Sequence, residues 1–359
     1  MTEEKITMMG IAEEERPGDR WLTLQEAVRE ALEEEMRRDD RIFLIGEDIG
    51  LYGGVYGCTK GLMQKFGRER VRDTPISEGA IVGAAIGAAA TGLRPVAEVM
   101  YVDWIAAGGA MEQIVNQLAK LPYIGAGQIK LPIVIRVACG SRYPAVSNGP
   151  HHNQSFEAWF MHIPGIWIAV PSTPYDAKGL LKYAIRSDNP VIFFEHKLLY
   201  YARHKLIQKL YPTMVSYVPE EEYLIPFGKA DIKLEGEDVT VIATMAMVHK
   251  VLKAANELKK EGISVELVDP RTLVPLDKET IIKSVKKTGR AVVVSEDWKT
   301  AGVTAEIAAM IMEEAFDYLD APVKRVATRE VPLAYSHILE GAALPSEEDI
   351  IKAVKEVVG

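Results

Sequence analysis

Short apolar runs alternate with amphipathic helical segments along this chain, and the alternation occurs twice. In the first 205 residues, runs typical of buried parallel strands lie at 42–45, 96–100, 133–137, 167–170 and 191–194. Helical periodicity fills intervals at 24–39, where Thr23 and Glu26 form a capping box, and at 111–121 and 177–186. This pattern predicts an α/β fold, with a doubly wound, mainly parallel sheet covered by helices on both faces.

The second set of alternating segments follows an irregular stretch. Residues 206–227 contain three prolines and the run Glu220-Glu221-Glu222, which is typical of a linker between domains. Beyond it we expect strands at 239–243, 264–268, 291–294 and 323–326, and helices at 247–260, 278–286 and 304–318. The pattern indicates a flexible acidic arm at 1–20, a first domain at 21–205, and a second, smaller domain at 228–359 with about four parallel strands.

Composition and missing motifs exclude several classes of protein. The net charge of -9 argues against a nucleic-acid partner. Cys58 and Cys139 are the only cysteines, so we expect no disulfide framework, no zinc site and a reducing compartment. No signal peptide, lipidation motif, Walker A loop or Gly-x-Gly-x-x-Gly motif is visible, and we expect a cytoplasmic protein without a membrane partner.

One carboxylate, Glu78, opens a predicted helix made almost wholly of small apolar residues. Ser77 is a suitable N-cap and Gly92 a suitable C-cap, which places Glu78 beside the positive end of the helix dipole. Glycine costs about 1 kcal/mol in a helix relative to alanine, so glycines in register indicate close approach of another backbone, as at a subunit interface. The three glycines that share one face are Gly79, Gly83 and Gly87. The apolar run is shorter than the ~20 residues that a membrane span requires.

Two adjacent histidines, His151 and His152, lie in a loop before a helix that contains aromatic residues. A histidine at the mouth of a parallel sheet suits acid/base catalysis, because its ordinary pKa of about 6.5 lets it donate and accept protons near neutrality. Neighbouring histidines usually diverge in direction, which disfavours joint metal binding. A purely structural role for either residue remains open.

Matching stretches spread over nearly the whole chain define a resemblance. They include Asp-Thr-Pro-Ile-Ser-Glu at 73–78, Thr-Gly-Leu-Arg-Pro-Val at 91–96 and Pro-Ser-Thr-Pro-Tyr-Asp-Ala-Lys-Gly at 171–179. Further matches lie at 46–50, 52–56, 113–116, 152–155, 162–165, 188–192, 269–277 and 286–290. The sequence resembles the beta subunit of the thiamine-diphosphate-dependent decarboxylating component of 2-oxo acid dehydrogenase complexes, of the pyruvate, branched-chain or acetoin type. The resemblance implies a pyrimidine-binding domain followed by a transketolase C-terminal-like domain.

The resemblance also implies roles for individual residues. Glu78 would contact the aminopyrimidine ring nitrogen of thiamine diphosphate and activate the cofactor by sharing a proton with it. Met100 and Trp104 fall on the pattern whose aromatic residue packs on the pyrimidine, although phenylalanine or tyrosine is usual where Trp104 stands. His152 would lie near the substrate and serve decarboxylation or acyl transfer to a lipoyl group. Asn153 replaces the usual serine after that histidine.

Metal ions are implied in two places. The Gly-Asp-Gly motif that holds magnesium and diphosphate in this cofactor superfamily is missing, so an alpha subunit would have to supply the magnesium ligands. Some members of the family hold a structural potassium ion through a loop and one neighbouring residue. The equivalent positions here are Ile133, Ala184, Ile185, Ser187 and Asn189.

The implied activity is oxidative decarboxylation of a 2-oxo acid, with acyl transfer to lipoamide on the acyltransferase core. We expect a heterotetramer of two alpha and two beta chains. The second domain would serve dimerisation and would dock the basic subunit-binding domain of the acyltransferase through the acidic segment 340–349. The alternatives are half of a transketolase or deoxyxylulose-phosphate synthase, and a non-catalytic assembly subunit.

Overall fold

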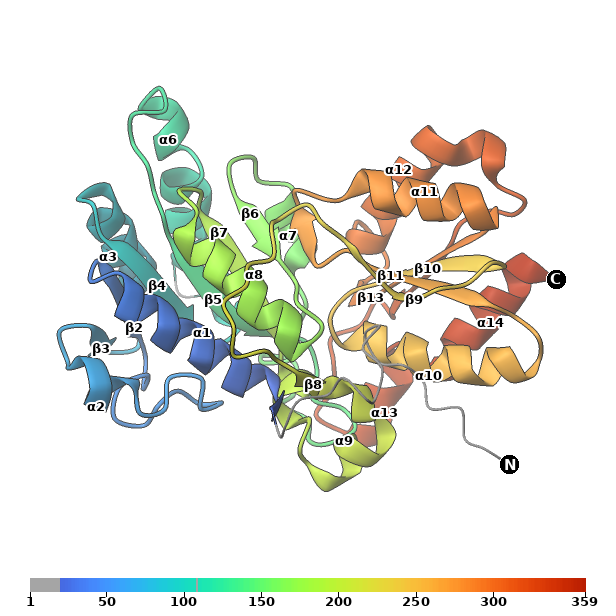
Figure 1. Ribbon diagram of the computed structural model, residues 1–359, viewed down its shortest axis with the longest axis horizontal. Helices are drawn as coiled ribbons and strands as arrows, with labels where there is room; N and C mark the ends of the chain where they lie inside the picture. Colours follow the sequence, from blue (N-terminus) through green and yellow to red (C-terminus); the bar gives the residue numbers. More distant parts are fainter. Residues whose placement is uncertain (1–19, 108) are drawn as a thin grey trace.

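Two sheets lie side by side in the computed structural model, which describes residues 20–107 and 109–359 (Figure 1). The first sheet, drawn in blue to green, is built mainly from the first half of the chain, and the second, drawn in yellow to red, from the second half. The acidic arm predicted at 1–20 lies, except for Arg20, outside the described residues. The predicted α/β class with mainly parallel sheets is confirmed.

The first sheet has seven strands in the order β12-β6-β7-β5-β4-β2-β3. Their bounds are β2 (Ile42–Gly46), β3 (Val71–Asp73), β4 (Arg94–Val99), β5 (Val134–Cys139), β6 (Trp167–Ala169), β7 (Val191–His196) and β12 (Thr272–Val274). All neighbours are parallel except β12, which pairs antiparallel with β6. The second half of the chain therefore contributes an edge strand to the first sheet, which the sequence analysis did not predict.

Helices cover both faces of this sheet. They are α1 (Leu24–Arg38), α2 (Leu62–Phe66), α3 (Glu78–Ala90), α4 (Val102–Ala107), α5 (Ala110–Glu112), α6 (Leu121–Ile124), α7 (Glu157–Met161) and α8 (Pro174–Arg186). Alternate residues of β2 point to opposite faces: Leu44 packs in the core with α1 and α8, and Phe43 packs in the core with α3. The predicted capping box of α1 is present, since the Thr23 amide donates to Glu26 at 2.9 Å.

The helix predicted at 111–121 is interrupted. Gln113–Leu118 forms a π-helix between α5 and α6, and the Ala119 amide donates to the carbonyl of Ile114 at 3.0 Å. Pro122 then stands in the first turn of α6, a position that proline tolerates because no helical partner is needed for its missing N–H. Apolar spacing does not distinguish this widened turn from an ordinary α-helix.

The second sheet has five strands, in the order β14-β13-β10-β11-β9. Their bounds are β9 (Asp231–Leu234), β10 (Val239–Ala243), β11 (Val265–Asp269), β13 (Ala291–Trp298) and β14 (Lys324–Thr328). The predicted set of four parallel strands omitted β9, an antiparallel edge strand whose four residues include two charges. The accompanying helices are α10 (Ala246–Lys260), α11 (Lys278–Thr288), α12 (Val303–Ala315), α13 (His337–Ala343) and α14 (Glu347–Val358).

The segment between the sheets, predicted as a linker, contains regular structure. It includes most of α9 (Lys205–Leu210), a 3-10 turn at Pro212–Met214 and β8 (Ser216–Tyr217). β8 pairs antiparallel with β1 (Trp21–Leu22), so this segment is tied to the start of the described chain. Within residues 20–107 and 109–359, no helix has the length and apolar character needed to cross a membrane.

Candidate active site

The candidate residues lie along the carboxyl edge of the first sheet. Glu78 follows β3, Met100 follows β4, and His152 belongs to the loop that follows β5. Strands β4 and β2 lie between β5 and β3, so His152 and Glu78 come from different parts of this edge. The carboxyl ends of parallel strands are where open α/β sheets bind ligands.

Glu78 is the first residue of α3 and is 7% exposed. Among the described residues, no hydrogen bond or ion pair engages its carboxylate. Glu47, 8% exposed, lies close by, and burial together with the charge of Glu78 raises the pKa of Glu47. The Ser77 side chain makes no cap bond, contrary to the prediction, although Ser77 does precede the helix. Within the described chain, the Glu78 carboxylate is therefore free to bind a ligand atom that enters the site.

Three aromatic rings meet farther along this edge. His152 lies edge-on to Tyr101, with ring centroids 4.9 Å apart, and edge-on to Trp104 at 5.1 Å. Tyr101 and Trp104 also contact each other at 4.8 Å. Met100, just before them, is partly buried and packs against the core. The structure thus brings together two of the predicted residues, His152 and Trp104, around a tyrosine that the sequence analysis had not singled out.

The environments of the two adjacent histidines differ. His151 is exposed, whereas His152 is partly buried. Burial lowers the pKa of His152, and the positive charge of Lys197 lowers it further. His152 is therefore a neutral imidazole near pH 7, able to accept a proton at one nitrogen and donate at the other.

A buried ion-pair network lies within the sheet beneath these rings. Arg136 on β5 donates to Glu195 on β7 through Nε at 2.6 Å and Nη2 at 2.8 Å, and to Glu98 on β4 at 2.6 Å. The Tyr200 hydroxyl donates to Glu195 at 2.6 Å. This network joins three adjacent strands below the site. Only its alternation of charged and apolar residues along the strands could have indicated it from sequence.

The candidate potassium positions lie near an arginine. Arg94 donates from Nε to the carbonyl of Ile185 at 2.9 Å and from Nη2 to the carbonyl of Ser187 at 2.5 Å. The Ala184 carbonyl accepts from the Ser187 amide at 3.2 Å, and the Ile133 carbonyl from the Val191 amide at 2.9 Å. The Asn189 side chain donates to the Ser187 hydroxyl at 3.1 Å. Each carbonyl retains a second lone pair, but the guanidinium already places positive charge at this loop.

Two further expectations concern surfaces. A Cβ at Gly83 would meet only the Gln113 side chain, at 3.2 Å, and one at Gly87 would meet nothing within 4 Å. Among the residues that the structure describes, no other backbone segment approaches these two glycines closely. Glu340, the first residue of the predicted acidic docking segment, is fully buried and cannot face a partner, so that part of the prediction is wrong. Glu348 and Asp349 are exposed.

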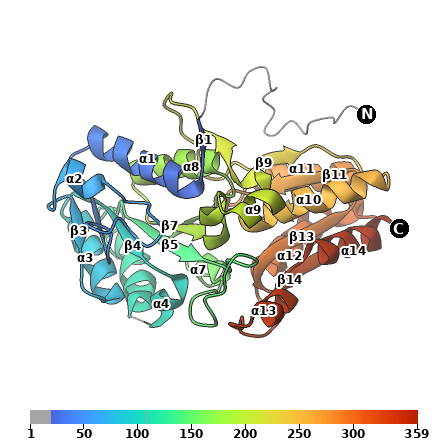
Figure 2. The same ribbon diagram turned by 90° about the horizontal axis from the view of Figure 1, so that it is seen from below.

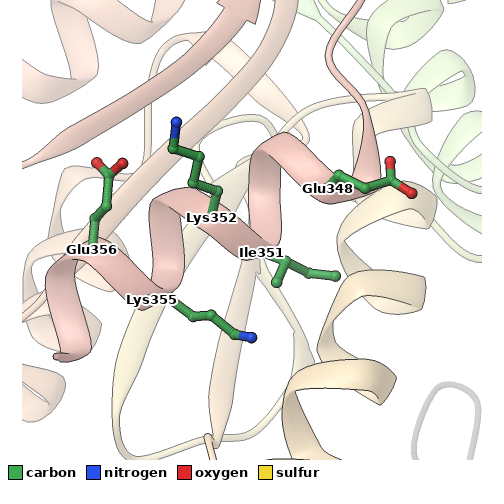
Figure 3. Close-up of a pocket in the computed structure, with 5 residues that line it drawn as sticks. All are labelled: Glu348, Ile351, Lys352, Lys355 and Glu356. Carbon is green, nitrogen blue, oxygen red and sulfur yellow. The ribbon is translucent and has the colours of Figure 1, made fainter.

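A shallow hollow beside α14 contains none of the candidate catalytic, cofactor-binding or potassium-binding residues. It is lined by Glu348, Ile351, Lys352, Lys355 and Glu356, whose side chains fan out around the helix (Figure 3). Lys355 pairs with Glu261 at 2.6 Å and Glu356 with Lys324 at 2.8 Å, so two of the four charged side chains that line the hollow are engaged. Within residues 20–107 and 109–359, no group of three histidine, cysteine or acidic side chains is arranged to hold a metal ion.

The fold belongs to a recognisable class of domains. Residues 21–203 match the transketolase pyrimidine-binding domain, and residues 228–350 match the transketolase C-terminal domain. A solved split-gene transketolase, described as an inactive beta4 tetramer, has the same fold with a TM-score of 0.71 and 24% identity, covering 94% of this chain and 98% of that one.

Sequence relatives narrow the class. The chain is 46% identical to the pyruvate dehydrogenase E1 component subunit beta of Rickettsia bellii, covering 94% of this chain and 98% of the relative. It is 44% identical to the 2-oxoisovalerate dehydrogenase subunit beta of Bacillus subtilis (92% and 97%) and 42% identical to the acetoin:2,6-dichlorophenolindophenol oxidoreductase subunit beta of that organism (95% and 98%). The chain belongs to the family of 2-oxo acid dehydrogenase E1 beta subunits and their acetoin-type relatives. Its pyrimidine-binding domain implies dependence on thiamine diphosphate.

Proposed function

We propose that this chain is the beta subunit of a 2-oxo acid dehydrogenase, which decarboxylates a 2-oxo acid oxidatively and transfers the acyl group to lipoamide. The observation that carries the proposal is the buried Glu78 carboxylate, which has no partner within the described chain. Extensive identity to E1 beta subunits along the chain supports the same reaction class. The substrate is pyruvate or a branched-chain 2-oxo acid, the two kinds of acid named among the relatives.

Glu78 would hold the pyrimidine nitrogen of thiamine diphosphate through a shared proton, and Met100 and Trp104 would pack against the ring. When bound, the cofactor supplies a carbon nucleophile and an electron sink for decarboxylation. His152, neutral near pH 7, would accept or donate a proton at the substrate side.

An alpha subunit would complete the site. The chain lacks the Gly-Asp-Gly magnesium motif, so the partner would hold magnesium and diphosphate. We propose two alpha and two beta chains, with the face of Gly79, Gly83 and Gly87 packed against a neighbouring subunit. The lipoyl and subunit-binding domains of the acyltransferase core would be further partners. Cytoplasmic localisation remains a prediction.

Calorimetry tests the shared site. The isolated chain at micromolar concentration should bind thiamine diphosphate and magnesium negligibly, whereas its mixture with an alpha chain of the same family should bind them tightly. Assays of the mixture with pyruvate, 2-oxoisovalerate and acetoin would then identify the substrate. Tight binding by the isolated chain would contradict the half-site, and no binding by an assembled mixture would favour an assembly subunit.

Potassium is a second, separate proposal. The carbonyls of Ile133, Ala184, Ile185, Ser187 and Asn189 would hold the ion through lone pairs that Arg94 leaves free. The melting temperature should then be higher in potassium chloride than in sodium chloride at equal ionic strength. Equal melting temperatures would mean that the guanidinium alone supplies the positive charge at this loop.

A further inference from the structure

Asn153, the residue after His152, is held at both ends of its side chain. Its Nδ2 donates to Glu340 Oε1 at 2.8 Å, and its Oδ1 accepts from Lys197 Nζ at 2.9 Å. All three side chains are buried, with Lys197 and Glu340 fully so. A carboxylate that accepts at one end and a lysine amine that donates at the other fix which way the amide points.

Glu340 reaches this loop from the other half of the molecule. It lies on α13, in the segment after the second sheet, and Figure 2 shows α13 beside the loop that joins β5 to α7. The Ser141 hydroxyl at the start of that loop also donates to Glu340 Oε1, at 2.6 Å. One buried carboxylate therefore contacts the loop on both sides of its tip.

Packing around α13 restricts the loop further. The Tyr143 ring lies 4.6 Å from the ring of His337, and a Cβ at Gly341 would come within 2.6 Å of the Tyr143 ring. Only glycine allows the helix to approach the ring so closely. Lys197 connects the other end of the amide to the aromatic group, since its Nζ lies 5.2 Å from the centre of the Tyr101 ring, which itself contacts His152.

We propose that Glu340 is a positioning residue for His152, acting from the second half of the molecule through Asn153 and its contact with Lys197. The proposal deepens the proposed function, on which its catalytic part rests. It also gives a reason for asparagine where serine is usual, because the longer amide can donate to Glu340 and accept from Lys197 at once.

Hydrogen exchange on the isolated chain tests whether Glu340 holds the loop at 141–155 in place, and it requires no catalytic activity. Glu340→Ala should speed amide exchange in residues 141–155 at least several-fold, because the loop loses its buried acceptor. Glu340→Gln retains an acceptor oxygen and should exchange like the unaltered chain. Glu348→Ala, in the same acidic segment but exposed, is the matched control. Unchanged exchange in Glu340→Ala would overturn the proposal.

Kinetics of the complex with the alpha subunit test the effect on His152. Glu340→Ala should lower kcat about 10-fold with little change in KM, and Glu340→Gln should recover most of that loss. Proton exchange at the thiazolium carbon, which depends on Glu78, should not change. Adding Asn153→Ala to Glu340→Ala should lower kcat less than twofold further, because both substitutions remove the same hydrogen bond between Asn153 and Glu340. Multiplicative losses would mean separate structural effects and would overturn the proposal. An inactive unaltered complex would instead contradict the proposed function. The amide hydrogen exchange experiment would still decide whether Glu340 holds the loop.

Discussion

The two sheets share an architecture, yet Glu78 and Glu47 at the carboxyl edge of the first differ from Asp269 at that of the second in their hydrogen-bond partners. At the first sheet, the carboxylates of Glu78 and Glu47 are buried without hydrogen bonds or ion pairs among the described residues. At the second, Asp269 ends β11 and accepts hydrogen bonds from the Ser172 hydroxyl and the Arg271 amide. An edge that leaves buried charge unsatisfied requires a ligand or partner, whereas an edge that satisfies it can serve as a support.

The second edge supports the first domain through several such contacts. Glu296 on β13 accepts from the Ser141 amide at 2.5 Å and lies 3.1 Å from His196 at the end of β7. Asp176 on α8 lies between Lys233 at 2.6 Å and Arg271 at 2.7 Å. Each contact joins the second half of the molecule to elements of the first sheet. We therefore assign the chemistry to the carboxyl edge of the first sheet, and the attachment of the two halves of the molecule to that of the second. Substitutions at each edge can test this assignment.

The largest expected effect is on stability, at the second edge. Asp176→Asn would leave Lys233 and Arg271 buried without their central carboxylate, and we expect a loss of about 3 kcal/mol, the lower end for a broken buried ion pair. Urea unfolding at pH 7 measures it. Glu235→Gln, an exposed change nearby, should stay within about 0.5 kcal/mol. A loss below about 1 kcal/mol would mean that Asp231, which lies 2.6 Å from Lys233 and 2.9 Å from Arg271, replaces Asp176.

In acid, the unaltered chain and Asp176→Asn should have similar free energies of unfolding. Burial would raise the pKa of Asp176, but Lys233 and Arg271 outweigh it and lower the pKa to about 2. Because the folded pKa is depressed, the stabilisation is complete above the unfolded value of about 3.9 and is lost as the pH falls towards 2. The difference between Asp176→Asn and the unaltered chain should therefore shrink below pH 4.

At the first edge, Glu78→Gln should slow proton exchange at the thiazolium carbon at least ~100-fold in the complex with the alpha subunit, the scale of a lost acid/base group. The amide is nearly isosteric but cannot share a proton with the pyrimidine nitrogen. NMR follows the exchange directly. Ser77→Ala is the matched control, since Ser77 is exposed and makes no cap bond. Unchanged exchange in Glu78→Gln would assign activation of the cofactor to another residue.

The sequence predicted regular elements well and side-chain partnerships poorly, for a physical reason. The run at 239–243 coincides with β10, and Glu78 begins α3 as expected, because the composition and spacing of apolar residues act locally. β3, β9 and β12 were missed, since each is short and is stabilised by pairing with another strand. Tertiary pairing of that kind leaves little trace in local sequence.

The candidate site divides in the same way. Glu78, His152 and Trp104 belong to recognisable local motifs and could be chosen from sequence. Lys197 and Glu340 could not, because they contact Asn153 only through the fold, 44 and 187 residues away along the chain. Glu340 looked like surface charge in an acidic run, and only its burial shows that it faces inward.

His152→Ala should lower complex activity about 100-fold if the imidazole moves a proton during decarboxylation or acyl transfer. His151→Ala should retain most activity, because His151 is exposed and makes no contact with the Tyr101 and Trp104 rings that hold its neighbour. Steady-state assays with lipoamide as acceptor compare the two. Equal losses would mean that the loop is merely disordered, and a larger loss for His151→Ala would move the catalytic position by one residue.

The smallest effect is expected at Trp104. Trp104→Phe restores the residue type usual in the family and keeps a ring against His152 and Tyr101, so it should weaken thiamine diphosphate binding by no more than about fivefold, or about 1 kcal/mol. Calorimetry on the complex with the alpha subunit measures the dissociation constant. Trp159→Phe, at a half-exposed tryptophan stacked on Phe156, is the control for the effect on binding of replacing any tryptophan by phenylalanine. A loss of 100-fold or more in Trp104→Phe alone would show that the pocket requires the full indole, and that Trp104 helps to define the site rather than merely filling a place that phenylalanine can occupy.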